Sequence, residues 1–240
     1  MFSIHKEMEN KLYLIPTWLS EDSIHVIPSY VADIINSLDE FVVENEKSAR
    51  QFLKKAGYKK SLTDARLHLL NEHTHASEIS QLIKPLLEGK SLGLLSEAGC
   101  PAVADPGADL VKEAHKNNIA VIPLVGASSI ILSLMASGLN GQSFLFSGYI
   151  PKERMARIKT LKELEKTALT KNQTQIFIEA PYRNQHLLDD ILQACNQDTM
   201  LCIASEITGA HEFIKTKSIR EWKKKIPEIN KRPTIFLIGR

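Results

Sequence analysis

The sequence predicts an α/β protein, and three observations lead to this class. Short, continuously apolar runs alternate with segments of helical periodicity along the whole chain. Such continuous runs are typical of strands in sheets that are covered on both faces. Hydrophobic residues make up 43% of the 240, which supplies a packed core and makes global disorder improbable.

Nine strands are expected, five in the first half and four in the second. They lie at 12–15, 40–44, 66–70, 91–96, 119–124, 143–149, 174–180, 199–207 and 233–239. Helical patterns lie between them, around 47–57, 75–88, 107–117, 128–137, 152–169, 183–196 and 218–225. Either one nine-stranded sheet or two domains that divide near residue 125 would accommodate these elements.

Charge and cysteine content narrow the class of protein. The formal net charge of +2 excludes a strongly basic arm but permits a local basic patch. Cys100, Cys195 and Cys202 show no CxxC spacing, so we expect neither disulfides nor zinc, and a cytoplasmic location. The uncharged stretch 117–151 is interrupted by proline, glycine and serine, so a buried helix at 128–137 is favoured over a membrane span.

The segment "LLSEAGCPAVADPGADLV" (94–111) is the strongest candidate for a ligand-binding loop. It follows a strand, and ligands of open α/β sheets bind beyond the carboxyl ends of strands. Gly99 permits close backbone approach, and two prolines stiffen the loop. Asp105 and Pro106 suit the start of the next helix. The functional interpretation is that the loop backbone binds a ligand. The alternative is that the loop is only a stiff connection between a strand and a helix.

The segment "PLVGASS" (123–129) repeats this arrangement. A strand ends in a glycine turn, and Ser128 and Ser129 then open a helix. Capping that helix is the common role of such serines, and binding a ligand carboxylate or ribose is the alternative. The chain has no GxxxxGK[ST] motif and no GxGxxG after a strand, which disfavours the ATP and nicotinamide chemistry of those motifs.

Other polar residues are weaker candidates. His73 and His75 do not share a helix face, so no metal site is expected there. Cys100 has no neighbouring histidine that would activate it. The basic clusters at 151–159 and 223–225 are either solvated helix faces or phosphate-binding groups, and Arg183 follows a strand where an anion could bind.

In this order the loops resemble the class III S-adenosylmethionine-dependent methyltransferases, the tetrapyrrole methylase superfamily. The resemblance is nearest to the branch that methylates a cytidine ribose 2′-oxygen of bacterial 16S ribosomal RNA. It rests on "SEAGCP…DPG", "PLVGASS", "SGLNGQSFLFSGYIPK", "FIEAPYR" and "ASEITGAHE", spread over about residues 38–240.

The resemblance implies two α/β/α domains, 1–124 and 125–240, with a cofactor cleft between them, and commonly a homodimer. It implies S-adenosylmethionine as cofactor and RNA or the small ribosomal subunit as partner, without a membrane. The implied cofactor-binding residues are Ala98, Gly99, Cys100, Val103, Ser128, Ser129 and Glu179. Because Cys100 stands where similar enzymes have threonine, a nucleophilic role is not expected.

The chain departs from the family pattern at its start. The glycine-rich T-P-I-G-N-L-x-D loop is here "IPTWLSEDSIHVIP", in which Thr17 is kept and Trp18 replaces the proline. The family's E-D-T-R is here "ENEK" from Glu44, and its second-motif aspartate is Glu97.

Methyl transfer to a ribose hydroxyl requires alignment of the reactants and removal of the hydroxyl proton. Glu97 and Glu206 are the candidate catalytic groups, with Asp105 as a further possibility, and Lys152, Arg154 and Arg183 are candidate phosphate-binding residues. Two alternatives remain: methylation of a small molecule such as a tetrapyrrole, and a non-catalytic cofactor-binding homologue.

Overall fold

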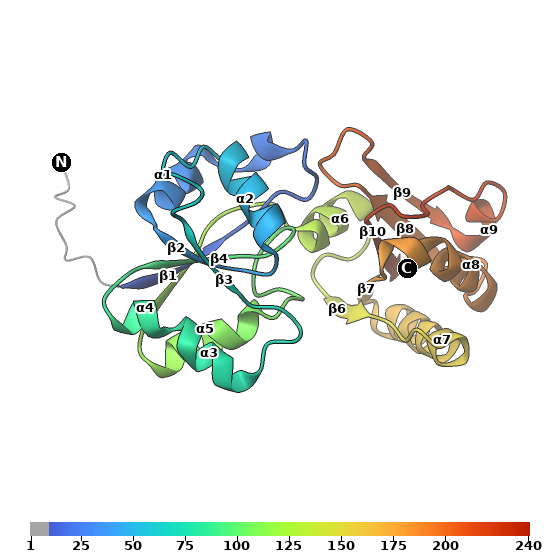
Figure 1. The fold of residues 1–240 in the computed structure, drawn as a ribbon. Helices are drawn as coiled ribbons and strands as arrows, with labels where there is room; N and C mark the ends of the chain where they lie inside the picture. The colour runs from blue at the N-terminus through green and yellow to red at the C-terminus, as the bar shows by residue number, and fades with distance from the viewer. Residues whose placement is uncertain (1–9) are drawn as a thin grey trace. The chain divides into compact units, whose positions relative to one another are not determined.

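The computed structural model describes residues 10–240, which divide into two compact units. The first unit ends at Ala127 and the second begins at Ser128, close to the boundary expected from the sequence. Each unit has its own five-stranded sheet, so the chain does not form one nine-stranded sheet. Figure 1 shows the elements of each unit.

The first unit is built on an entirely parallel sheet in the order β3-β2-β4-β1-β5. Its strands are β1 (Lys11–Ile15), β2 (Glu40–Val43), β3 (Arg66–Leu69), β4 (Leu92–Leu95) and β5 (Ala120–Pro123). Its helices are η1 (Ile24–Val26), α1 (Ser29–Ser37), α2 (Glu46–Lys55), α3 (Ala76–Leu82), α4 (Lys84–Leu87) and α5 (Gly107–Lys116). Two apolar clusters pack on the sheet, one with α1 and α2 and the other with α3, α4 and α5 (Figure 1).

Central strand β4 owes its position to Gly93. A Cβ atom there would lie 2.6 Å from Phe41 Cδ1 and 2.8 Å from Ile15 Cδ1. Every residue of β2 and β4 is buried, which explains their continuous apolar sequence. The packing holds the carboxyl ends of β1, β2 and β4 beside one another.

The second unit has a mixed sheet in the order β6-β7-β10-β8-β9. Its strands are β6 (Phe144–Tyr149), β7 (Thr174–Ile178), β8 (Met200–Ser205), β9 (Phe213–Ser218) and β10 (Thr234–Gly239), and only β6 and β7 pair in parallel. Its helices are α6 (Ser129–Ser137), α7 (Arg154–Lys171), η2 (Pro181–Arg183), α8 (Asn184–Ala194) and α9 (Ile219–Trp222). Helices α7, α8 and α9 contribute to its apolar core (Figure 1).

The structure corrects several expectations from the sequence. The second unit has five strands rather than four, because "FIKTKS" forms β9. Helix α6 is only partly buried, since Met135 is 74% exposed. The expected helix at 75–88 is two short helices, α3 and α4, and α1 was not anticipated. None of the described helices is both long and apolar enough to cross a bilayer.

Candidate functional site

The loop Ser96–Pro106 lies at the carboxyl edge of the first unit's sheet. It follows β4, whose neighbours are β2 and β1, so the residues directly after these strands reach the same edge. Glu44 follows β2, and Thr17 lies shortly after β1. The sequence therefore brings three separate strand ends to this loop.

Thr17 holds the loop through one hydrogen bond from its backbone and one from its side chain. The Thr17 N–H donates to the Gly99 carbonyl at 2.9 Å, and its hydroxyl donates to the Ser96 carbonyl at 3.3 Å. Gly99, Ala102 and Ala104 have φ values of 77°, 65° and 62°. Such left-handed residues reverse the chain repeatedly, which makes the loop compact.

Two carboxylates also bind the loop backbone. Glu44 accepts the Glu97 N–H at 2.7 Å, and Asp105 accepts the N–H groups of Ala102 at 2.9 Å and Gly107 at 2.7 Å. Burial raises the pKa of Glu44, and the nearby charges of Asp105 and Glu97 add to this. Burial likewise raises the pKa of Asp105, more than its two N–H partners lower it.

Asp105 lies one position before the N-cap of α5, whereas the sequence suggested that it would be the N-cap itself. Helix α5 begins at Gly107, and its cap position is Pro106, which has no side-chain capping bond. The Asp105 carboxylate still binds the first helical N–H, and it also ties the loop to the helix through Ala102. Asp105 therefore stabilises the loop and the helix start together.

Gly99 and Cys100 form the tightly packed part of the loop. A Cβ on Gly99 would lie 3.1 Å from Leu19 Cδ2 and 3.4 Å from the Ala127 carbonyl oxygen. The Cys100 thiol donates to that carbonyl at 3.5 Å, and burial raises its pKa. A raised pKa keeps the thiol protonated at neutral pH, which does not suit a nucleophile. Ala98 and Val103 are exposed.

The segment without glycine that replaces the family's opening loop is well packed. Trp18 is buried and meets the Phe52 ring edge-on, with 5.1 Å between ring centroids. The Lys55 ammonium lies 5.0 Å from the Trp18 ring centroid. The Leu19 side chain lies beside Gly99, where it would be 3.1 Å from an added Cβ. Trp18 therefore anchors on α2 the segment whose Thr17 holds the loop Ser96–Pro106.

The second unit places its candidate serines at a helix start. Ser128 is the N-cap of α6, and its hydroxyl accepts the Ile131 N–H at 3.5 Å. Ser129 is the first residue of the helix. The capping role that the sequence suggested is therefore present, although the hydrogen bond is long.

The buried Glu179 and the partly exposed Arg183 form an ion pair after β7. Glu179 accepts from the Arg183 guanidinium at 2.5 Å and from the Ala180 N–H at 2.7 Å. Burial alone would raise the pKa of Glu179, but Arg183 and the N–H bond outweigh it, and the net pKa is lowered. Glu179 Oε2 and Arg183 Nε are buried and have no hydrogen-bond partner in the described part of the chain.

Of the remaining charged candidates of the second unit, Glu206 and Arg154 form ion pairs, whereas Lys152 forms none among the described residues. Glu206 has a positive φ of 50°, and its carboxylate pairs with Arg232. Arg154 pairs with Asp190 at 3.0 Å and with Gln193 at 2.9 Å. Lys152 is exposed.

The structure groups the candidates by unit. Glu97, Ala98, Gly99, Cys100 and Val103 share one loop of the first unit, whereas Ser128, Ser129, Lys152, Arg154, Glu179, Arg183 and Glu206 belong to several segments of the second. Sequence reasoning missed Glu44 as part of the loop's support. Its position directly after a buried strand was the available signal.

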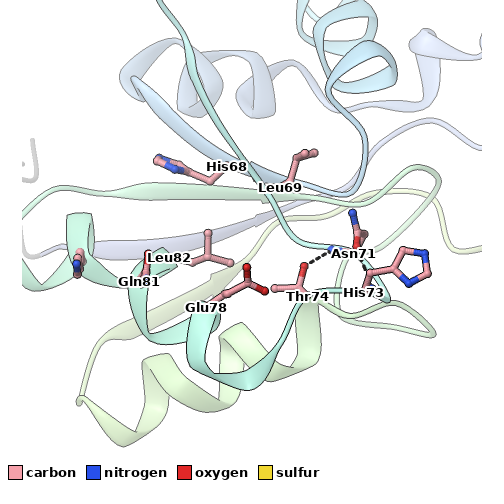
Figure 2. Close-up of a pocket in the computed structure, with 9 residues that line it drawn as sticks. His68, Leu69, Asn71, His73, Thr74, Glu78, Gln81 and Leu82 are labelled. Carbon is pink, nitrogen blue, oxygen red and sulfur yellow. Dashed lines mark hydrogen bonds between the residues drawn. The ribbon is translucent and has the colours of Figure 1, made fainter.

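The first unit has a further pocket beside β3 and α3. It has a volume of about 520 Å³, and it is lined by His68, Glu78 and seven further residues. Figure 2 shows His73 close to Asn71, whose N–H donates a hydrogen bond to the Thr74 hydroxyl at 3.0 Å. None of the residues expected from the sequence to catalyse or to bind cofactor or substrate lines this pocket, although His73, for which no metal site was expected, does.

Comparisons with known proteins agree with the fold and with the family that the sequence resembles. The family model of tetrapyrrole (corrin/porphyrin) methylases matches residues 28–222. A protein of Halalkalibacterium halodurans named ribosomal RNA small subunit methyltransferase I is 31% identical over 219 residues, 90% of this chain and 71% of the relative. The protein of the same name from Vibrio cholerae is 31% identical over 210 residues, 88% of this chain and 69% of the relative.

Solved structures share the fold at low identity. Cobalt precorrin-4 methyltransferase, CbiF, gives a TM-score of 0.64 at 13% identity and covers 99% of this chain and 98% of that one. Uroporphyrin-III C-methyltransferase from Thermus thermophilus, solved with S-adenosylhomocysteine, gives 0.57 at 13% identity and covers 96% and 98%. The match along most of its length shows that this chain belongs to the tetrapyrrole (corrin/porphyrin) methylases and is a methyltransferase that uses S-adenosylmethionine.

Proposed function

We propose that this methyltransferase modifies RNA of the small ribosomal subunit, on the ribose 2′-oxygen of a cytidine. One observation carries the proposal: relatives named ribosomal RNA small subunit methyltransferase I match about nine-tenths of the chain at 31% identity. Similarity of that extent includes both units rather than a single motif.

The residues of the first unit fit a cationic cofactor. S-adenosylmethionine supplies an electrophilic methyl group on a positively charged sulfur. Glu44, Glu97 and Asp105 gather negative charge at the loop, and no arginine or lysine forms a salt bridge with them in the described residues. The main chain from Ala98 to Val103 would bind the cofactor, because Gly99 brings the backbone close and Val103 offers an exposed apolar side chain.

The second unit would supply further contacts. Ser128 and Ser129 have a hydroxyl and free N–H groups at the start of α6, which suit a carboxylate or a ribose. Glu179 is the proposed acceptor for a cofactor hydroxyl or amine. Lys152, Arg154 and Arg183 are the proposed phosphate-binding residues, of which Lys152 is exposed and forms no salt bridge among the described residues.

Removal of the ribose proton requires a base near the reacting oxygen. Glu97 is the better placed of the two proposed bases, because its side chain is exposed while Glu44 holds its backbone N–H in position. Glu206 would first have to release Arg232.

We further propose a homodimer in the cytoplasm. Edge strand β6 carries no charged residue and exposes Phe144 and Leu145, which favours pairing with a second copy. The three cysteines are unpaired, as in a reducing compartment. Light scattering of the purified protein, with a Leu145→Lys variant as the comparison, tests the dimer.

The decisive experiment is transfer of a radiolabelled methyl group to small ribosomal subunits that lack their native methylations. Nucleoside analysis should find label in a 2′-O-methylcytidine, with Glu97→Gln greatly reducing turnover. Label in uroporphyrinogen III but not in RNA would favour the small-molecule alternative. Calorimetric binding of S-adenosylmethionine without transfer to either would favour a non-catalytic homologue.

A further inference from the structure

The second unit carries a concentration of lysines that the candidate site does not use. Lys215 and Lys217 lie on β9, and Lys223, Lys224 and Lys225 directly follow α9. These five residues are called the lysine surface below. The whole chain has a net charge of only +2. Five lysines within residues 215–225 are therefore a local excess of positive charge.

The fold brings the two halves of the lysine surface together around Trp222. Lys215 and Lys217 are two apart on a strand and share one of its faces. The Lys217 ammonium lies 4.9 Å from the Trp222 ring centroid, and Phe213 packs against the same ring. Backbone hydrogen bonds of Lys223, Lys224 and Lys225 to Ile219, Glu221 and Trp222 continue the turn of α9.

The acids near the lysine surface are engaged elsewhere. Glu221 caps α9 by accepting from the Ser218 N–H at 3.0 Å and hydroxyl at 2.9 Å; these bonds lower its pKa, and the nearby charges of Lys217 and Lys224 add to this. Asp198 pairs with Arg220 at 2.7 Å. Within residues 10–240, none of the five lysines forms a salt bridge with a carboxylate, so their charges are available to an anionic partner.

Protection of an edge strand explains only part of the lysine surface. Lysines on an outer strand such as β9 discourage pairing with other chains, which accounts for Lys215 and Lys217. Lys223, Lys224 and Lys225 lie beyond the strand. Adsorption to a membrane would favour several apolar side chains that insert among lipids, but Ile219, Trp222 and Ile229 are buried and only Ile226 of the apolar residues at 219–229 is exposed.

A pocket of about 290 Å³ adjoins Lys223. Leu192 and Ile226 give it apolar walls, and Asp189 and Gln193 of α8 add polar groups. An unpaired base stacks on apolar walls and donates its amino hydrogens to a carboxylate such as Asp189. The pocket thus complements a base where the lysines complement phosphates.

We propose that the lysine surface docks the phosphate backbone of the substrate RNA, with an unpaired base in the adjoining pocket. The proposal rests on the proposed function, because it concerns the RNA that the enzyme methylates. It assigns to the second unit a docking surface that does not include Lys152, Arg154 or Arg183, although Gln193 of its pocket accepts a hydrogen bond from Arg154.

The test compares two triple variants with equal loss of charge. Lys223→Gln/Lys224→Gln/Lys225→Gln removes three cations from the lysine surface. Lys162→Gln/Lys166→Gln/Lys171→Gln removes three exposed cations from α7 and is the matched control. Binding of a labelled RNA hairpin with an unpaired loop is measured by fluorescence anisotropy over a series of salt concentrations.

We expect the first variant to bind at least tenfold more weakly at about 0.1 M salt, with its logarithmic salt slope reduced by about 2. The control should match the wild type, and both variants should keep their affinity for S-adenosylmethionine. Unchanged affinity and slope in the first variant would overturn the proposal, as would stronger binding of the wild type to phosphatidylserine vesicles than to RNA. Equal binding to the looped hairpin and to a continuous duplex would remove the pocket from the proposal.

Failure of the docking surface and failure of the proposed function are distinguishable. If the wild type methylates small subunits while the first variant binds RNA normally, the surface is wrong and the function stands. If the wild type binds RNA through the lysines but transfers no methyl group to the subunits, the surface stands and the function is wrong.

Discussion

Carboxylates follow strands in both units, but their partners differ. In the first unit, Glu44 and Asp105 accept backbone N–H groups, and their pKa values are raised. In the second, Glu179 and Glu206 pair with arginines, and the pKa of Glu179 is lowered. These carboxylates of the first unit thus have no basic partner among the described residues, whereas an arginine neutralises those of the second. The partner, rather than the residue type, decides whether such a carboxylate can attract a cation.

The largest effect is expected from breaking the neutralised pair. Arg183→Ala leaves Glu179 buried without its cation, which should lower the free energy of unfolding by about 3 kcal/mol. Urea unfolding followed through Trp222, in a Trp18→Phe background, reports the second unit alone. The exposed Arg220–Asp198 pair is the control, and Arg220→Ala should cost less than about 1 kcal/mol. Equal losses of unfolding free energy in the two variants would show that burial of Glu179 does not strengthen its dependence on Arg183.

A smaller effect is expected at the backbone of the first unit's loop. Gly99→Ala should lower the free energy of unfolding by about 2 kcal/mol, because an alanine there is strained and also presses on Leu19 and the Ala127 carbonyl. Gly89 has a φ of 85° and open space around it, so Gly89→Ala measures the strain alone. Calorimetry should show weaker binding of S-adenosylmethionine only for Gly99→Ala. Equal cofactor affinity in the two variants would exclude Gly99 from the binding loop.

The two carboxylate types should respond to pH with opposite signs. The lowered pKa of Glu179 contributes stability above its unfolded value of about 4.3, and this is lost as the pH falls through its folded pKa. The raised pKa of Glu44 contributes stability below that value, which is lost as the pH rises through its folded pKa. At neutral pH, therefore, Glu179→Gln should destabilise the protein.

Glu44→Gln should leave stability unchanged or increase it at neutral pH, since the amide oxygen can still accept the Glu97 N–H. Thermal unfolding of both variants from pH 4 to pH 8 measures the two effects. Destabilisation by both substitutions at neutral pH would show that the first unit's carboxylates are compensated like those of the second.

The smallest effect is expected at Cys100. Cys100→Thr should leave the affinity for S-adenosylmethionine nearly unchanged, because a hydroxyl can replace the thiol as donor to Ala127. The raised pKa of the thiol also predicts slow alkylation by iodoacetamide at neutral pH. Rapid alkylation together with a collapse of cofactor affinity would give Cys100 a chemical role.

The sequence predicts the strands where burial dominates and fails where context decides. All four residues of β4 are buried, and its apolar run indicated it directly. Strand β9 was missed because Lys215 and Lys217 interrupt its apolar residues, and only pairing with β8 makes it a strand. Helix α6 looked like a core helix, yet its apolar composition does not reveal that Met135 is exposed.

The candidate site shows the same limit. The loop at Ser96–Pro106 was predictable, since glycine and proline after a strand have local meaning. The roles of Thr17 and Glu44 were not, because their partners Gly99 and Glu97 are far away in the sequence. The packing of Trp18 on Phe52 was not predictable either, because these residues are also far apart in the sequence.

The packing of Trp18 has a consequence for the thermodynamics of cofactor binding. A loop that orders only when a ligand arrives loses conformational entropy at that moment, by about 1–2 kcal/mol for each residue fixed. Here Trp18, Thr17 and Asp105 already hold the loop in one conformation. Binding should therefore proceed with a small entropic penalty and a heat capacity change set by the cofactor's own buried surface.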